Sequence, residues 1–334
     1  MAEWAKHLRK DWKPFLLLFK DKDETRGIFP LMYRDEKRRG VLPLRRIRFL
    51  GFEATDFSLV LAEKSNVEKL VGDSLDWLFS GKLRWELMIL DDLAEGNPMI
   101  DALHFWLGKK GIPYAIEKGK YFYVDLNRAW EEIWSETSKN FVRRNINLAR
   151  NRITKAGSWK VVRDPDWDVE TIITEASKMH ITRQADLDRD SFYADERHRD
   201  FLRQMIRVYQ EKGLFRSYWL HYENEYIAYM LGFEQDEIFY AWNMAFEPRY
   251  SHFFPSKLLL YEIIKDCYDR KLKEFSFMRG ETSYKAKWTQ KTRVNYRFVI
   301  KNTHSLYGKT LDLLDRYSSK LKHGKLQVMF KSAL

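Results

Sequence analysis

The order of segments between Tyr226 and Trp288 constrains this chain more than any other feature. Two strand-like runs, Tyr226–Phe233 and Glu237–Phe246, are followed by a short aromatic loop, a helix that begins near Pro255, and another strand. Such an order places a loop and a helix N-terminus against the splayed end of a sheet, where backbone N–H groups and the helix dipole can hold a pyrophosphate. We therefore predict a mixed sheet with a phosphate site at its open end.

The composition is that of a folded globular protein with room for two domains. The 334 residues are 45% hydrophobic and 32% charged, which excludes a disordered chain. Aromatic residues make up 16%, and two interpretations remain open: large core side chains, or an aromatic-lined groove for a long ligand. Cys267 is the only cysteine, so no internal disulfide can form, and its apolar helical surroundings predict a small core residue.

The net charge is +11, and basic residues are concentrated in three segments. These are Tyr33–Arg48, Glu136–Lys155 and the tail after Ile300. Such a surplus fits an anionic partner, namely nucleotide phosphates, a lipid headgroup surface or RNA. It fits equally well a charge that serves solubility alone.

The first residues, Met1–Lys13, are charged and lack the apolar stretch of a secretory signal. The longest apolar runs, such as Phe15–Phe19 and Leu258–Tyr261, are too short to span a bilayer. We expect a cytoplasmic protein, and the basic tail leaves open a peripheral position at the inner face of an anionic membrane.

Strand-like and helical runs alternate up to a division near Trp130–Ser135, which is typical of layered α/β or α+β structure. The predicted strands are Phe15–Phe19, Gly27–Tyr33, Phe57–Leu61, Trp85–Leu90 and Tyr121–Leu126, and the predicted helices are Asn66–Phe79 and Pro98–Lys110. Ser135–Gly157 then predicts one helix, because its apolar residues share a side and Gly157 is a natural stop. Its basic face either is solvated or contacts an anion.

The remaining sequence predicts the element order βααβββαβ. The predicted strands are Trp159–Arg163, Arg216–Tyr222, Tyr226–Phe233, Glu237–Phe246 and Glu274–Met278, and the predicted helices are Asp168–His180, Ala194–Gly213 and Ser256–Arg270. A short polar Glu-Gln-Asp turn predicts an antiparallel hairpin between the third and fourth of these strands. A closing strand over Asn295–Lys301 and an amphipathic helix over Thr303–Lys322 complete the prediction.

Three stretches carry a resemblance to a known family. They are Ser138–Asn145, Phe254–Leu259, and the run from Phe275 to Trp288 that contains Gly280-Glu281-x-x-Tyr284-Lys285-x-x-Trp288. With the element order, they resemble the FemAB-like, CelD-type acetyltransferase family, in which two GNAT-like halves are fused. The sequence departs from the family pattern at Ser256, where the pattern has Gly, and at Ser276, where it has Asp.

The resemblance implies an α+β fold of tandem GNAT-like domains with mixed central sheets flanked by helices. It implies a degenerate GNAT-like domain over residues 1–134, a GNAT-like acyltransferase domain over 135–302, and a basic amphipathic tail over 303–334. The implied activity is acyl-CoA-dependent N-acylation of an amine on a cell-envelope precursor. The acceptor would be an amino sugar, an amino lipid or a sphingoid-type base, and it would attack the thioester directly.

Two other functions remain open. One is aminoacyl transfer from charged tRNA, as in FemAB relatives, which the surplus of Arg and Lys suits. The other is a non-catalytic binding module with the same fold, which the Ser256 departure leaves open. The implied co-substrate is a coenzyme A thioester, and no metal is expected because the eight His show no metal-ligand spacing.

The candidate catalytic residues are Glu281, Tyr284 and His180. Glu281 and Tyr284 are three residues apart at the opening of an expected helix, where Glu281 can accept a proton and Tyr284 can protonate a leaving thiolate. His180 titrates in the useful pH range. The structural alternatives are a helix cap for Glu281, packing for Tyr284 and a C-terminal cap for His180.

Further residues are expected to bind the two substrates. The cofactor-binding candidates surround the predicted phosphate loop and are Phe246, Arg249, Phe254, Pro255, Ser256, Lys257 and Leu258. The substrate-binding candidates are aromatic or basic and are Arg183, Trp219, Tyr240, Trp242, Arg279, Lys285 and Trp288.

Overall fold

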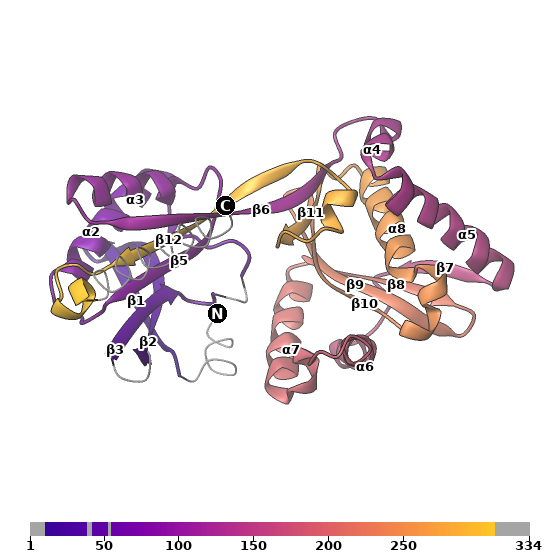
Figure 1. Ribbon diagram of the computed structural model, residues 1–334, viewed down its shortest axis with the longest axis horizontal. Coiled ribbons are helices and arrows are strands. Elements are labelled where there is room, and N and C mark those ends of the chain that lie inside the picture. The colour runs from indigo at the N-terminus through magenta and orange to yellow at the C-terminus, as the bar shows by residue number, and fades with distance from the viewer. Residues whose placement is uncertain (1–10, 39–41, 53–54, 311–334) are drawn as a thin grey trace, which may run out of the picture. The chain divides into compact units, whose positions relative to one another are not determined.

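The computed structural model describes residues 11–38, 42–52 and 55–310 (Figure 1). These residues form two compact units. The chain passes from the first unit to the second between Gly119 and Lys120, and it returns to the first between Arg293 and Val294. The last strand therefore belongs mostly to the first unit, although it follows the second unit in the sequence.

The first unit is built on a mixed sheet in which strands β1, β2, β3, β5 and β12 are neighbours in that order, with β4 beside β2. The strands are β1 (Lys13–Asp21), β2 (Glu24–Arg38), β3 (Leu42–Phe49), β4 (Leu61–Ala62), β5 (Leu87–Ala94) and β12 (Thr292–Lys301). Helices α2 (Val67–Phe79) and α3 (Pro98–Lys109) pack against each other and share one apolar core with the sheet. Phe298 and Ile300 of β12 are fully buried in that core.

Strand β3 was not among the predicted elements, because its sequence reads as a basic patch. The register pairs Asp35 of β2 with Arg45 of β3, and these two side chains form an ion pair with an Nε–Oδ1 distance of 2.8 Å. Arg48 also pairs with a carboxylate, that of Asp91. The alternate residues Ile47 and Phe49 point into the core. Arg46 also pairs, with Glu36, so the charges of the arginines of this strand are largely matched.

Two other predictions in the first unit differ from the structure. The predicted strand over Phe57–Leu61 is mostly irregular, and only Leu61 and Ala62 pair, with β2. The predicted strand that begins at Trp85 starts instead at Leu87. Trp85 is fully buried and donates its indole N–H to the Leu78 carbonyl oxygen at 2.8 Å, so its side chain anchors the end of α2.

The second unit has the predicted order βααβββαβ, and this prediction is confirmed. Its elements are β7 (Trp159–Arg163), α6 (Val169–Ala185), α7 (Glu196–Glu211), β8 (Phe215–Tyr222), β9 (Glu225–Gln235), β10 (Ile238–Phe246), α8 (Pro255–Asp269) and β11 (Glu274–Arg279). The strand order is β6-β11-β10-β9-β8-β7, where β6 is Tyr114–Asp125. The predicted hairpin is also confirmed, since β9 and β10 are antiparallel and Gln235 faces Ile238.

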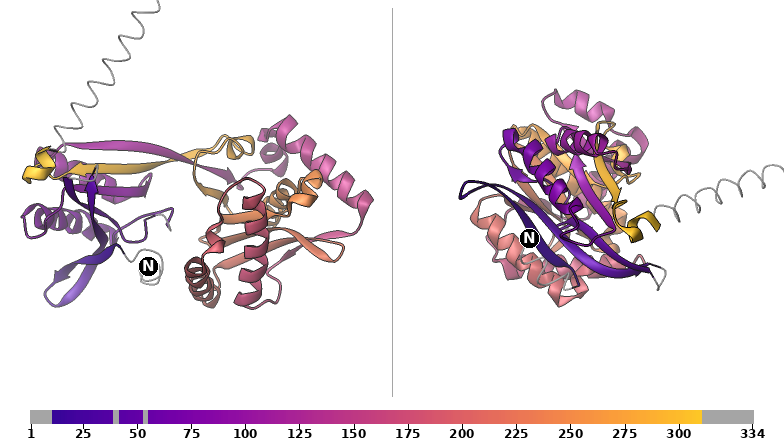
Figure 2. Two further views of the ribbon diagram at one scale, coloured as in Figure 1. Left: turned by 60° about the horizontal axis from the view of Figure 1, so that its bottom comes forward. Right: turned by 90° about the vertical axis from the view of Figure 1, so that its left-hand side faces the viewer.

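Helices cover both faces of this second sheet. Helices α5 (Arg144–Ala156) and α8 lie on one face, and α6 and α7 lie on the other (Figures 1 and 2). One core, which includes Cys267 of α8, fills the α5–α8 side, and a separate core fills the α6–α7 side. Cys267 is fully buried, as predicted, and burial raises the pKa of its thiol to about 12.

The single helix predicted over Ser135–Gly157 is interrupted. Helix α4 (Trp130–Glu136) ends before Thr137, which is extended, and a five-residue π-helical turn over Lys139–Arg143 then leads into α5. Ser138 causes the new start, because its hydroxyl accepts the Phe141 N–H at 3.3 Å and its carbonyl oxygen accepts the Val142 and Arg143 N–H groups at 2.9 and 3.1 Å. The predicted tail helix over Thr303–Lys322 lies mostly outside the described residues.

No described helix has both the length and the apolar character required to cross a bilayer.

A bulge at Trp242 interrupts the pairing of β10 with β9 and precedes Asn243, a half-buried residue whose side chain accepts from buried hydroxyls. The Asn243 carbonyl oxygen accepts the Tyr229 hydroxyl at 2.6 Å and the Tyr193 hydroxyl at 3.2 Å. Both tyrosines are fully buried. Asn243 therefore ties β10 to β9 and to the short turn of Phe192–Ala194.

We expect Asn243→Leu to lower the free energy of unfolding by about 2–4 kcal/mol, because two buried hydroxyls lose their acceptor. Urea unfolding measures this change. A triple variant that also carries Tyr193→Phe and Tyr229→Phe has no orphaned hydroxyl and should recover part of the loss. A triple variant no more stable than Asn243→Leu would contradict the role assigned to this acceptor.

Candidate functional site

Strands β10 and β11 separate after three residues of parallel pairing. The pairs are Ile238–Glu274, Phe239–Phe275 and Tyr240–Ser276. Beyond them β10 continues against β9 as far as Phe246, while β11 continues against β6 through a register shift between Ser276 and Arg279. Two parallel strands thus share a sheet and then diverge, which leaves strand edges between them that an extended ligand can pair with.

Helix α8 begins close to the end of β10. Phe254, its N-cap, has the left-handed conformation with φ 50° and ψ 47°, and Pro255 takes the first helical position. The Phe254 carbonyl oxygen already accepts the N–H groups of Lys257 at 3.0 Å and Leu258 at 3.1 Å. The Ser256 N–H is therefore the first-turn donor that remains for a ligand. The sequence led us to expect several free N–H groups at this helix start. Ser256 itself is helical, so the missing glycine is not needed for a positive φ there.

Two cations lie beside this helix start. The Lys257 ammonium is 3.8 Å from the centre of the Phe141 ring and 5.2 Å from that of Phe254, and partial burial lowers its pKa. Arg152 of α5 donates to the His252 carbonyl oxygen at 2.9 Å. Within the described part of the chain, no carboxylate pairs with either cation. Arg152 was not singled out as a site residue from the sequence, and the basic face of its helix was the available signal.

Arg249 does not join these cations. Its guanidinium forms an ion pair with Glu225 and lies 4.9 Å from the Tyr250 ring centre. The sequence predicted that Arg249 and Lys257 flank one phosphate site, and the structure gives Arg249 a carboxylate partner instead. Pro255 and Leu258 were also predicted to bind the cofactor. Their side chains are buried and pack in the core, so only their backbone can face a ligand.

The segment after β11 is a turn and not the expected helix. Only a single 3-10 turn forms, over Lys285–Lys287. The Glu281 carboxylate is exposed and accepts the Lys120 N–H at 2.9 Å. The Tyr284 ring meets Phe277 edge to face at 6.4 Å, and desolvation raises the pKa of its phenol. Tyr284 is therefore protonated at neutral pH and retains an exposed edge.

Lys285 is held within the same turn. It is 6% exposed, and its ammonium donates to the Arg279 carbonyl oxygen at 2.6 Å and to the Met278 carbonyl oxygen at 3.4 Å. Met278 has a positive φ of 57°. The ammonium thus satisfies the carbonyl groups where β11 ends, and it shapes the turn that carries Tyr284.

Several predicted substrate-binding residues are in the core. Trp219 is fully buried and packs on Trp167 and Tyr229, and Trp288 is 3% exposed beneath α4 and α8. Neither ring reaches solvent, because aromatic residues of this sequence fill the cores on both faces of the sheet.

The others lie at or near β10. Tyr240, the last residue paired with β11, and Trp242, in the bulge, are half-buried. Arg183 pairs with Asp186 and lies 4.5 Å from the Phe246 ring centre at the end of β10. Arg279 is exposed at the end of β11. Tyr240, Trp242 and Phe246 thus lie along the diverging part of β10, with Trp242 packed against the α6–α7 core and Phe246 against the α5–α8 core, while Arg279 lies at the end of β11.

His180 is not an end-of-helix residue, since α6 continues to Ala185. Its Nδ1 lies 2.8 Å from the Ser191 hydroxyl oxygen, and its ring packs against Phe192 and Tyr193. Burial lowers its pKa to about 4. The imidazole is therefore neutral near pH 7, and its contacts here are with the core.

The stability of the protein should depend on this histidine in acid. Between about pH 6.5 and pH 4 the unfolded chain binds a proton that the folded imidazole does not, so stability falls as pH is lowered, by up to about 3 kcal/mol. His180→Asn removes this titration. Urea unfolding at several pH values should therefore show a shallower acid decline in the variant, and equal slopes would contradict the assignment.

No cluster of three or more His, Cys, Asp or Glu side chains that could hold a metal ion lies among the residues that the structure describes.

Comparisons with known proteins agree with this geometry. Residues 140–286 match the family model of the acetyltransferase (GNAT) domain, whereas no curated protein sequence matches the chain. The fold is similar to the crystal structure of FemX, with 13% identity, a TM-score of 0.56, and coverage of 90% of this chain and 92% of that one. It is also similar to L-PGS from Bacillus licheniformis, with 13% identity, a TM-score of 0.55, and coverage of 90% and 88%.

A third similar structure is the C-terminal domain of a putative lysylphosphatidylglycerol synthetase from Agrobacterium fabrum. It has 14% identity and a TM-score of 0.52, and the coverage is 95% of this chain and 91% of that one. Identities this low show a common fold and not a common substrate. The predicted α+β fold class of mixed sheets flanked by helices is confirmed, and residues 140–286 match a GNAT-type acetyltransferase domain.

Proposed function

We propose that the protein is an acyl-CoA-dependent N-acyltransferase of the CelD-type branch, acting on an amine of a cell-envelope precursor. The observation that carries the proposal is the divergence of β10 from β11 next to a helix start with two unpaired cations, Lys257 and Arg152. A thioester of coenzyme A combines a chain of amides with a pyrophosphate. The amides can pair with the open strand edge, and the pyrophosphate can bind at the cationic helix start.

The donor would lie along β10. Its pyrophosphate would accept from the Ser256 N–H and from Lys257 and Arg152, whose charges no carboxylate of the described chain offsets. Its amide arm would pair with the free edge of β10 beyond Tyr240, and its thioester would lie between the strands. A backbone N–H of β10 in this stretch would stabilise the oxyanion that forms on the thioester carbonyl.

The reaction needs little more than positioning and proton transfer. The neutral acceptor amine attacks the carbonyl carbon, an N–C bond forms, and the C–S bond breaks. The thiolate takes the phenolic proton of Tyr284, whose raised pKa keeps it protonated. The nitrogen loses its extra proton to Glu281, directly or through water, and the products are an amide and the free thiol.

The acceptor class follows from the resemblance, and it is an amino sugar, an amino lipid or a sphingoid-type base. A lipid acceptor would favour a peripheral position on an anionic membrane surface at the cytoplasmic face. The basic residues on which that position depends are mostly in the tail beyond residue 310, outside the described residues.

Aminoacyl transfer from charged tRNA is the second candidate. It would need phosphate-binding cations over a large surface. Arg45 and Arg48, in the most basic segment of the first unit, already pair with Asp35 and Asp91. This pairing favours the coenzyme A thioester over charged tRNA as the donor. A non-catalytic binding module remains the third candidate.

The phosphate contacts can be tested by coenzyme A binding. Lys257→Met and Arg152→Met should each weaken binding about tenfold in calorimetry, because each removes one charged contact to the pyrophosphate. Lys212→Met, on the exposed end of α7, is the matched control and should leave binding unchanged. Binding of charged tRNA but not coenzyme A would select the second candidate.

Proton transfer can be tested by turnover with acetyl-CoA and a panel of amines. Tyr284→Phe should lower kcat roughly 100-fold while coenzyme A binding and the urea midpoint stay unchanged, because only the acidic proton is lost. Glu281→Gln should lower kcat less if water can replace it. Tyr209→Phe, on α7, is the control. Equal loss of stability and turnover in Tyr284→Phe would make this tyrosine a packing residue.

A further inference from the structure

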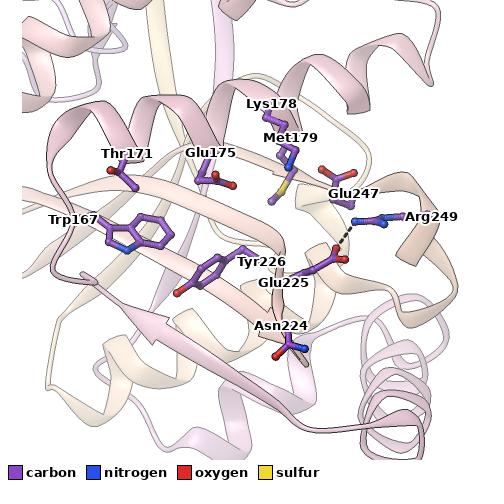
Figure 3. A pocket seen from close by; sticks show the side chains of 10 residues that line it. All are labelled: Trp167, Thr171, Glu175, Lys178, Met179, Asn224, Glu225, Tyr226, Glu247 and Arg249. Atoms are coloured by element: carbon purple, nitrogen blue, oxygen red, sulfur yellow. Dashed lines mark hydrogen bonds and ion pairs between the residues drawn. The ribbon is translucent and has the colours of Figure 1, made fainter.

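A cavity of about 460 Å³ lies in the second unit, on the α6 side of the sheet. Its wall comes from α6 and from Trp167 just before it, from the β8–β9 turn and the first residues of β9, and from the residues just after β10 (Figure 3). The lining residues are Trp167, Thr171, Glu175, Lys178, Met179, Asn224, Glu225, Tyr226, Glu247 and Arg249. The volume is within the range of roughly 300–1,000 Å³ that small-molecule sites occupy.

The charges in the cavity are unbalanced in favour of carboxylates. The Arg249 guanidinium is already paired with Glu225, and Figure 3 shows that pair at one side of the cavity. Glu175 and Glu247 are half-buried, and neither side-chain carboxylate has a hydrogen bond or ion pair within the described part of the chain. Lys178 is exposed and has no carboxylate partner there either. Two carboxylates thus face a single flexible cation.

The opposite part of the wall is aromatic and apolar. The Trp167 and Tyr226 rings meet edge to face at 4.8 Å, and Met179 lies on the same helix as Glu175. Ring faces attract organic cations, and an apolar wall suits the carbon skeleton that carries them. Half-buried carboxylates that share a cavity with aromatic rings therefore favour an alkylammonium ligand over an anion or a neutral molecule.

Glu247 lies at the end of β10 from which the chain leads to the proposed pyrophosphate site at the start of α8. It directly follows Phe246, the last residue of β10, and its N–H donates to the Ile227 carbonyl oxygen at 3.0 Å. Desolvation and the neighbouring Glu225 and Glu175 raise the pKa of its carboxyl, while Arg249 and Lys178 lower it. A bound ammonium would offset this cost, since it supplies the opposite charge and up to three N–H donors.

We infer that this cavity binds an ammonium group of the amine acceptor, with Glu247 and Glu175 as its carboxylate partners and Trp167 and Tyr226 as its aromatic wall. The inference rests on the proposed N-acyltransferase function for the identity of the ligand as the acceptor. The binding of an alkylammonium ion itself does not depend on that function. The cavity thereby limits the acceptor to small cationic amines, or to larger molecules that present one.

Calorimetry with 1,4-diaminobutane and glucosamine as probes tests the site, with 1,4-butanediol and glucose as their neutral counterparts. We expect saturable binding of at least one amine and none of its neutral counterpart. Glu247→Gln should weaken amine binding about tenfold, because the charge is lost and the shape is kept. Glu211→Gln, at the exposed end of α7, is the matched control and should have no effect.

A second variant should change the affinity for amines in the opposite direction. Lys178→Gln removes the one unpaired cation of the wall and should tighten amine binding severalfold, which a general loss of structure cannot do. The inference is overturned if the neutral probes bind as well as the amines, if Glu247→Gln and Glu211→Gln behave alike, or if no amine binds. Urea midpoints of all variants show that they are folded.

Turnover separates this inference from the proposed function. Amine binding that depends on Glu247, without acyl transfer from acetyl-CoA, would leave the cavity standing and overturn the proposed function. If acyl transfer occurs and the KM for the amine is unchanged in Glu247→Gln, the proposed function stands and the cavity is not the acceptor site. An increase in that KM with unchanged coenzyme A binding would support both.

Discussion

The divergence of β10 from β11 is the constraint on which the rest of the second unit depends. Three parallel pairs hold the strands together, and beyond Tyr240 and Ser276 each strand keeps a partner only on its outer side. Unpaired strand edges inside a sheet are costly unless another group satisfies them. The bulge at Trp242, the tyrosine hydroxyls on Asn243 and the Lys285 ammonium on the β11 carbonyls stabilise the divergence, and the open edges remain available to a ligand.

The same constraint explains why polar chemistry gathers at the end of β10. Glu247 and Phe254 lie within one short segment that connects β10 to α8. On one side of this segment, Lys257 and Arg152 form a cationic region at the helix start. On the other side, Glu175 and Glu247 form an acidic cavity. The end of this strand thus lies between a cationic region and an acidic cavity, which is where the proposed donor phosphates and the inferred ammonium group would bind.

Much of the fold could be predicted from the sequence, because hydrophobic periodicity and turn residues determine the elements locally. The βααβββαβ order and the β9–β10 hairpin were predictable for this reason. Strand β3 was missed because arginines surround its apolar residues and only Ile47 and Phe49 follow the period of two that a half-buried strand shows. The break at Ser138 was missed because apolar periodicity continues across it, and only the capping contacts reveal a new start.

The candidate site was less predictable, since it depends on contacts between distant residues. The helix start at Pro255 follows from local signals, but the pairing of Arg249 with Glu225 and the burial of Trp219 and Trp288 do not. Glu247 carries no motif at all. Its surroundings come from α6 and from the β8–β9 turn, which only the tertiary structure brings to it.

The return of the chain at Val294 has a consequence for biosynthesis. The core of the first unit includes Phe298 and Ile300, which are translated after the whole second unit. On the ribosome, nearly three hundred residues must emerge before that core can close. The continuous second unit can complete its own core earlier, so the N-terminal part of the chain is the part left exposed to chaperones and proteases for longest.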